Sequence, residues 1–358
     1  MNIEDLVRPS IKKIHIYEPG QEKEGYIKLA SNENPHAPHP RVVEAVVAEL
    51  ARANRYPLSG SPELVRALAR RHGVETGEVM VGNGSNEIID LLVRAFVQPG
   101  QNVVFPAPSF IVYALIPLIC GVEGRGVLCK DYRLDLAAMR AAMDAQTRMV
   151  FVCNPNNPTS TYVTAAQLDA FLDGLPENVL VVMDEAYVDY VDAADYPDSL
   201  ALRRQRNTVV TLRTFSKFHS IAGLRVGYAI ADPAVVDVLH RVRQPFNVNR
   251  LAQAAALAAL GVADEIRPRA REVIAERGRV GAVLRELGVA CPPSQTNFLF
   301  VDLGESPLDL HGALYAAGII VRRMGQFGST TNSYRVSLGT RAENDRLIAA
   351  LREVLGRT

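Results

Sequence analysis

Four clusters of polar residues in this sequence carry side chains that are suited to bind a ligand and to react with it. They are residues 82–86 (Gly-Asn-Gly-Ser-Asn), 154–160 (Asn-Pro-Asn-Asn-Pro-Thr-Ser), 184–187 (Asp-Glu-Ala-Tyr) and 214–217 (Thr-Phe-Ser-Lys). Each lies at, or directly after, the carboxyl end of an apolar run that is typical of a buried strand. In open α/β sheets, ligands bind outside the carboxyl ends of the strands. We therefore expect the four clusters to line one crevice, although each alone would be an ordinary turn.

Two of the clusters carry groups that hold a phosphate. Residues 82–86 combine two glycines with a predicted helix start, where free backbone N–H groups and the positive end of the helix dipole favour an anion. An ordinary helix cap is an equal alternative, and Glu87 replaces the third glycine of a dinucleotide-binding motif. Residues 214–217 contribute two hydroxyls, and Arg225 adds a guanidinium that suits phosphate oxygens.

The same crevice would contain a carboxylate, an amine and an amide. Asp184 ends a fully apolar strand, where its charge is costly unless a cation meets it; that cation is either a protein side chain or a protonated ring nitrogen of a ligand. Lys217, beside a cation and partly desolvated, would have a lowered pKa and act as a nucleophile, although most lysines are solvated surface residues. Two X-Pro bonds stiffen residues 154–159 and would hold the Asn157 amide toward a ligand; a rigid structural turn is the alternative.

The elements that position these clusters alternate between strand and helix from about residue 61. We expect strands at residues 79–81, 103–105, 149–153, 179–183 and 209–212. We expect helices at residues 61–73, 85–97, 134–143 and 164–174. This alternation predicts βαβ units and an α/β fold, in which a mostly parallel sheet lies between helices.

A second, smaller α+β domain is expected after residue 250. Long helical segments at 251–260 and 265–287 precede strand-like segments at 297–301, 318–321 and 335–338. We predict a large domain over residues 46–250. The small domain would then consist of residues 1–45 and 251–358.

Composition narrows the class of protein. The 358 residues include 39 basic and 39 acidic side chains, and this zero balance argues against nucleic acid or an anionic membrane as the main partner. No run approaches the ~20 apolar residues of a membrane span, and the first 16 residues lack the apolar core of a secretory signal. Four cysteines without a CxxC motif fit free thiols in a reducing cytoplasm, and seven histidines without metal-ligand spacing predict no metal site.

In combination, the motifs resemble those of the fold-type I pyridoxal-phosphate aminotransferases, and among them the histidinol-phosphate aminotransferase subfamily. The resemblance covers nearly the whole chain. Its carriers are residues 31–35, 55–57, 154–159, 184–187, 216–228, 245–249 and 335–340. It implies pyridoxal 5'-phosphate as the cofactor and the large and small domains typical of that fold.

The resemblance also implies catalytic and cofactor-binding roles. Lys217 would bond covalently to the cofactor and later move the proton of the substrate's α carbon. Asp184 would keep the pyridine nitrogen protonated, and Tyr187 and Asn157 would bond the phenolic oxygen. The phosphate would contact Gly84, Ser85, Asn86, Thr214, Ser216 and Arg225.

Two aromatic residues complete the expected cofactor site. Phe110 matches the aromatic residue that stacks on the pyridine ring, although a core phenylalanine is a serious alternative. Tyr56 matches a tyrosine that reaches the phosphate of the neighbouring subunit, which implies a homodimer with active sites at the interface.

For the substrate, Arg335 matches the arginine that clamps a carboxylate, and Arg322 a second anion-binding arginine, with Arg323 left open as the rival. At substrate positions the resemblance further implies Tyr17, Asn34 and, again, Asn157. The implied reaction is a ping-pong transfer between histidinol phosphate and glutamate or 2-oxoglutarate, in histidine biosynthesis.

Other activities stay open on the same scaffold. An aromatic amino-acid aminotransferase shares nearly every motif, and a phospho-threonine decarboxylase or a regulator of the same fold is a remote alternative. Two departures from the family pattern stand out. Ser160 replaces the usual glycine after Asn-Pro-Thr, and residues 324–333 carry nothing that names a substrate.

Overall fold

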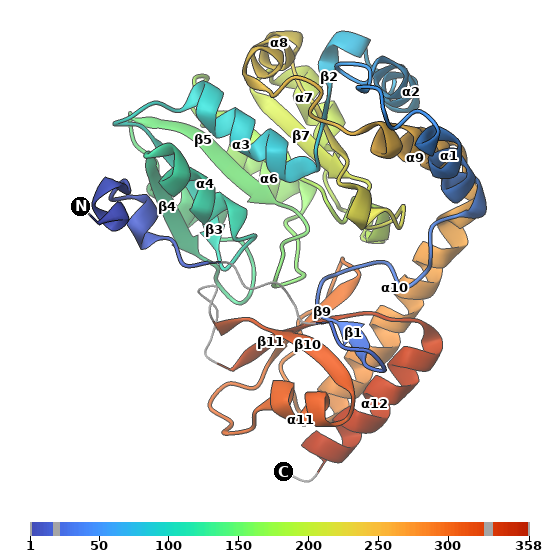
Figure 1. The fold of residues 1–358 in the computed structure, drawn as a ribbon. Helices are drawn as coiled ribbons and strands as arrows, with labels where there is room; N and C mark the ends of the chain where they lie inside the picture. The colour runs from blue at the N-terminus through green and yellow to red at the C-terminus, as the bar shows by residue number, and fades with distance from the viewer. Residues whose placement is uncertain (1, 17–21, 326–331, 357–358) are drawn as a thin grey trace.

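A mixed sheet forms the centre of the larger part of the molecule (Figure 1). The computed structural model describes residues 2–16, 22–325 and 332–356, and within them this sheet has seven strands in the order β2-β8-β7-β6-β5-β3-β4. The strands are β2 (Val79–Gly82), β3 (Asn102–Ala107), β4 (Glu123–Leu128), β5 (Thr147–Cys153), β6 (Leu180–Asp184), β7 (Val209–Thr214) and β8 (Gly227–Ile230). Strand β8 runs opposite to the other six strands, which are parallel to one another, so the prediction of a mostly parallel α/β sheet is confirmed.

The apolar runs of the central strands have a simple physical reason. Successive side chains of a strand point to opposite faces, and both faces of this sheet are covered by helices. Phe151 and Val182 pack into one core cluster, whereas Val150 and Val181 pack into another, and all four are fully buried. The first face is covered by α3 (Ser85–Phe96), α4 (Val112–Cys120) and α8 (Pro233–Val242). The second is covered by α5 (Leu136–Ala141), α6 (Ala165–Leu172) and α7 (Ser199–Gln205).

A four-stranded sheet forms the smaller part, which lies below the large sheet in Figure 1. Its order is β1-β10-β11-β9, and its strands are β1 (Ile27–Leu29), β9 (Phe298–Asp302), β10 (Ile319–Arg323) and β11 (Ser333–Ser337). The helices of this part are α10 (Ala263–Glu286), α11 (Leu310–Ala316) and α12 (Arg341–Leu355). The expected small α+β unit is therefore present, and β1 joins it from the other end of the chain.

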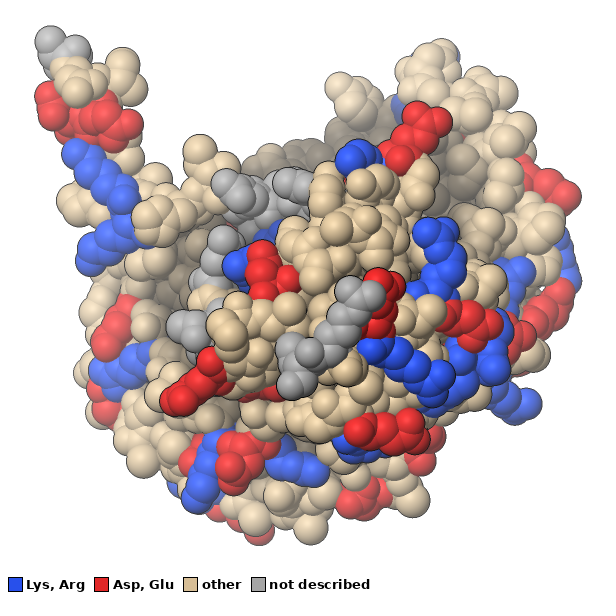
Figure 2. All heavy atoms as spheres, turned by 90° about the horizontal axis from the view of Figure 1, so that it is seen from below, with Lys and Arg blue, Asp and Glu red and all other residues tan. Residues whose placement is uncertain are grey.

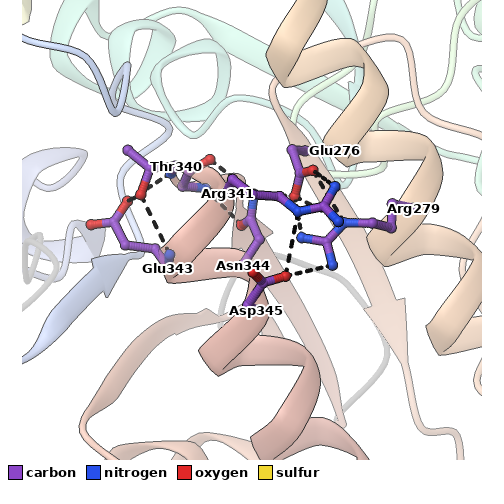
Figure 3. A network of polar contacts seen from close by, with 8 residues as sticks. Glu276, Arg279, Thr340, Arg341, Glu343, Asn344 and Asp345 are labelled. Atoms are coloured by element: carbon purple, nitrogen blue, oxygen red, sulfur yellow. Dashed lines mark hydrogen bonds and ion pairs between the residues drawn. The ribbon is translucent and has the colours of Figure 1, made fainter.

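A polar network fastens α10 to α12 (Figure 3). Glu276 is buried, with Arg279, Arg341 and Asn344 as its donors. Burial alone would raise the pKa of Glu276, but these donors hold it below its ordinary value. Asn344 also bonds both backbone groups of Gly339. The network therefore fixes the segment that follows β11.

Helices α1 (Pro40–Leu50) and α2 (Pro62–His72) pack on α9 (Arg250–Gly261); α2 also contacts β2 of the large sheet, and α9 contacts α10. The predicted boundaries at residues 46 and 251 both fall inside helices of this group, α1 and α9. The residues at the amino terminus lie elsewhere, since Arg8 donates to the carbonyl of Ile119 in α4. The domain division stays a prediction.

The surface seen in Figure 2 mixes both signs of charge, in keeping with the balanced composition. Over the described ranges, no helix is both long and apolar enough to cross a bilayer. The described residues also contain no group of three or more potential metal ligands.

Candidate active site

A cavity of about 270 Å³ lies where the four polar clusters meet. The register of the strands explains why the four clusters lie together. Asp184 at the end of β6 is level with Cys153 at the end of β5, and Gly227 pairs with both Gly82 and Thr214. Each cluster thus follows its strand at the same edge of the sheet. Predicted site residues that line the cavity are Ser85, Asn86, Phe110, Asn157, Asp184, Tyr187, Thr214, Ser216, Lys217, Arg225, Arg322 and Arg335.

One end of the cavity is an anion cradle. Helix α3 starts after Gly84 with no side-chain cap, so its first backbone N–H groups remain available as donors. Gly84 has φ +76°, and a Cβ at this position would lie 2.7 Å from the Arg225 guanidinium. Arg225 Nη1 lies 3.4 Å from the Ser216 hydroxyl, to which Thr214 Oγ1 donates at 3.0 Å. A glycine is therefore required where backbone, hydroxyls and guanidinium converge.

A buried carboxylate lies in the same cavity. Asp184 is 3% exposed, and burial raises its pKa above the ordinary value. Tyr113 Oη donates to Asp184 Oδ2 at 2.5 Å, and the backbone N–H of Ala186 donates to Oδ1 at 3.2 Å; both bonds act in the opposite direction on the pKa. A cationic group in the cavity would relieve the remaining cost of this buried charge.

Lys217 is the amine of the cavity. Its Nζ donates to the carbonyl of Ser31 at 3.4 Å. Burial, and then the charge of Arg335, lower the pKa of Lys217 to about 8, while Glu33 acts in the opposite direction. A lysine with this pKa has a substantial neutral, nucleophilic fraction at physiological pH.

Asn157 and Tyr187, predicted to bond the cofactor's phenolic oxygen, and Arg335, predicted to bind a substrate carboxylate, all line this cavity. Arg335 on β11 donates to Asn157 Oδ1 at 2.7 Å and to the carbonyl of Ala30 at 2.8 Å. The amide nitrogen of Asn157 remains a donor for a ligand. Tyr187 lines the same wall and is 4% exposed.

The neighbouring arginines Arg322 and Arg323 take different places. Arg322 lines the cavity, and its backbone pairs with that of Arg335 across β10 and β11. Arg323 instead forms an ion pair with Asp309 at 2.6 Å. Adjacent residues of a strand point to opposite faces, so the arginine in the cavity is Arg322.

A family model, described as aminotransferase class I and II, matches residues 24–351 of the chain. The chain belongs to the class I and II aminotransferases.

Named relatives agree with this membership. The chain is 44% identical to "Histidinol-phosphate aminotransferase 2" of Pseudomonas aeruginosa over 98% of both chains. It is 43% identical to the "Aromatic amino acid aminotransferase" of Mycobacteroides abscessus, over 96% of this chain and 97% of that one. Among solved structures, histidinol-phosphate aminotransferase from Sinorhizobium meliloti in complex with pyridoxal-5'-phosphate is similar, with a TM-score of 0.86, 28% identity and 98% of each chain covered.

Among the predicted site residues that the structure describes in this aminotransferase, Gly84, Asn34 and Tyr56 do not line the cavity. Asn34 donates its amide to the backbone carbonyls of Lys217 and Phe218, at 3.2 and 3.0 Å, so it contacts the backbone of the lysine loop and is not part of the cavity lining. Tyr56 is 77% exposed and stacks on Phe246 with ring centroids 4.6 Å apart. Tyr17 lies outside the described residues.

Two further polar residues of the site were not predicted individually. Tyr113 bonds Asp184, and Asn32 donates to the Tyr187 hydroxyl at 2.9 Å. Tyr113 lies in the apolar helix α4, whose sequence contains no motif that would indicate a role in the site. Asn32 belongs to the motif at residues 31–35, which is the only sequence signal that could have pointed to it.

The unusual Ser160 adopts a conformation that favours glycine. Its φ is +63°, it is fully buried, and its hydroxyl has no hydrogen-bond partner among the described residues. Backbone hydrogen bonds to Asn156 and Gln295 hold Ser160 in this conformation. The proline-rich loop also contains cis peptide bonds before Pro155 and Pro158.

Proposed function

We propose that the chain is a histidinol-phosphate aminotransferase, which exchanges an amino group between histidinol phosphate and glutamate or 2-oxoglutarate in histidine biosynthesis. One observation carries this proposal. Arg322 and Arg335, from neighbouring strands, line the same cavity as Lys217 and Asp184. Histidinol phosphate has a phosphate where glutamate has a carboxylate, so one cationic end serves both partners. The names of the relatives from P. aeruginosa and S. meliloti support the same substrate.

The donor groups of the cavity fit pyridoxal 5'-phosphate as the cofactor. The cradle formed by the start of α3, Thr214, Ser216 and Arg225 suits its phosphate. Asp184 needs a cation, which a protonated pyridine nitrogen supplies. When bound, the cofactor withdraws electrons from the α carbon of the substrate. We therefore assign Ser85, Asn86, Phe110, Asn157 and Tyr187, which line the cavity, to the cofactor site, together with Gly84, whose backbone lies close to Arg225.

The chain's own side chains would divide the remaining work. Arg335 and Arg322 bind the anionic end of the substrate and orient its α carbon toward Lys217. The Lys217 amine, whose pKa is about 8, would accept the proton of the substrate's α carbon and deliver it to carbon C4′ of the cofactor. Because one cavity binds the amino donor first, and the 2-oxo acid acceptor only after the first product has left, the kinetics should be ping-pong.

An aromatic amino-acid aminotransferase is the second candidate, because the M. abscessus relative with that name is nearly as similar. A panel of half-reactions separates the two. Cofactor-loaded protein is mixed with histidinol phosphate, phenylalanine, tyrosine or glutamate, and the loss of visible absorbance is followed. We expect the largest kcat/KM for histidinol phosphate; a larger value for phenylalanine or tyrosine would replace this proposal with the second candidate.

We also propose a homodimer in the cytoplasm, with Tyr56 contributing to the partner's site. The wide exposure of Tyr56, which lines no part of the cavity of its own chain, supports this role. Mixing Tyr56→Phe chains with Lys217→Ala chains tests it. Both variants alone should be weak, and mixed dimers should regain one intact site; mixtures without any gain would contradict the shared site.

A further inference from the structure

The buried side chain of Asn32 connects three parts of the active site. Asn32 is 1% exposed and lies between β1 and α1. Its amide nitrogen donates to the hydroxyl of Tyr187 at 2.9 Å, and its amide oxygen accepts from the hydroxyl of Ser337 at 3.1 Å. Its backbone N–H donates to the same Ser337 hydroxyl at 2.8 Å. Asn32 therefore joins β11 to the polar cluster after β6.

An asparagine suits this position for two independent reasons. Asn32 has φ +53°, in the left-handed region that asparagine tolerates better than most other residues. Its backbone carbonyl accepts from Asn297 at 3.1 Å, which holds the backbone in this conformation. With the backbone fixed and Ser337 bonded to the amide oxygen, the N–H group of the amide faces Tyr187.

The direction of this hydrogen bond determines where the Tyr187 proton can go. A phenol has one proton to donate and lone pairs to accept with. Because Asn32 is the donor, the Tyr187 oxygen is the acceptor, and its own proton is left for a group inside the cavity. Burial raises the pKa of Tyr187 above its ordinary value, so the phenol keeps that proton, although the charge of Arg335 and then the bond from Asn32 act in the other direction.

We propose that Asn32 is a positioning residue, which turns the Tyr187 hydroxyl so that it donates to the phenolic oxygen of pyridoxal phosphate. This inference rests on the proposed function, because it needs that cofactor in the cavity. A donated hydrogen bond stabilises the ionised form of the phenolic oxygen. Loss of Asn32 should therefore raise the pH at which the cofactor's visible absorbance titrates.

The test measures that midpoint in cofactor-loaded protein. Asn32→Gly keeps the φ angle and removes the amide, and we expect it to raise the midpoint by about one pH unit. Tyr187→Phe should raise it at least as much. In the double variant, Asn32→Gly should add nothing, because the hydroxyl on which it acts is gone. Full addition of the two shifts would overturn the proposal.

Other variants keep the test decisive. Asp131→Gly also changes a residue with positive φ (50°) but outside the cavity, and should leave the midpoint unchanged. If Asn32→Gly does not fold, Ser337→Ala removes the anchor of the amide and should raise the midpoint in the same direction; an unchanged midpoint would overturn the role of Asn32. A wild-type protein with no titrating absorbance would instead contradict the proposed function.

Discussion

Arg335 and Asn157 lie 2.7 Å apart, from guanidinium Nη1 to amide Oδ1, and join the small sheet to the proline-rich loop of the large one. The second Arg335 nitrogen donates to the carbonyl of Ala30. Two bonds of this kind fix the plane of a guanidinium, so the group is oriented for an anion in the cavity. Arg335, which would bind the substrate, is thus held in place by Asn157, which would bind the cofactor.

Replacing Arg335 should harm both halves of the reaction. Arg335→Ala removes charge-assisted bonds worth about 1.5–3 kcal/mol each, so kcat/KM should fall roughly 100-fold for histidinol phosphate and for glutamate alike. Arg335→Lys is the matched control, since it keeps the charge and loses the planar fork. Single-turnover kinetics with each donor would check this. A loss confined to one donor would show that the two anions bind at different places.

The carboxylate of Asp184 should matter for turnover and little for folding. Asp184→Ala removes a buried charge, so the fold should persist, but without that charge kcat should fall roughly 100-fold or more. Tyr113→Phe should cost much less, about tenfold or below, because it removes only one bond to the carboxylate. Steady-state kinetics with circular dichroism as the folding control would decide. A near-normal kcat in Asp184→Ala would count against its assigned role.

The lowered pKa of Lys217 predicts how capture of the cofactor depends on pH. Only the neutral amine attacks a carbonyl, so the rate at which apoprotein gains visible absorbance should rise about tenfold per pH unit below pH 8. It should level off above about pH 8, not near the ordinary lysine value. Glu33 raises this pKa, so Glu33→Gln should move the plateau to lower pH. A rate still climbing steeply between pH 9 and 10 would contradict the lowered pKa.

Ser160→Gly should stabilise the protein. Serine at φ +63° is strained by about 1 kcal/mol relative to glycine, and its buried hydroxyl lacks a hydrogen-bond partner within the described part of the chain. Glycine removes both costs, although it also makes the unfolded chain more flexible. We expect the free energy of unfolding to rise by about 1 kcal/mol in urea denaturation. Ser160→Ala keeps the backbone strain and removes only the hydroxyl, so its free energy of unfolding should rise by less. An equal rise in the two variants would show that backbone strain is not the cause.

His219 should make the protein sensitive to mild acid. It is 9% exposed, and burial lowers its pKa from 6.5 to about 4, with Asp189 acting against the shift and Arg71 and Arg267 with it. Because the unfolded chain binds the proton more readily, stability is complete above pH 6.5 and falls as pH drops toward 4. Between pH 7.5 and 5 the loss from this group is about 2 kcal/mol. His219→Phe should lose about 2 kcal/mol less than wild type over that interval; parallel curves would exclude His219 as the cause.

Local sequence pattern was sufficient to locate the central strands of the large sheet and the polar clusters that follow them. Strands β5, β6 and β7 lie within a few residues of their predicted positions, because a strand buried on both faces must be apolar throughout. The clusters after them were recognisable because ligand-binding groups follow such strands directly. Strand β4 was missed, since its Glu-Gly-Arg-Gly-Val-Leu sequence is largely exposed and has no such pattern.

The distant residues that complete the site could be identified only from the folded structure. Asn32 and Tyr187 are 155 positions apart, and Tyr113 and Asp184 are 71 positions apart, so no local sequence pattern could predict either hydrogen bond. The choice between Arg322 and Arg323 likewise depended on which face of β10 meets the cavity. Local pattern reports what a segment must bury, whereas contacts between segments depend on how whole sheets and helices pack, and that information is spread over the entire chain.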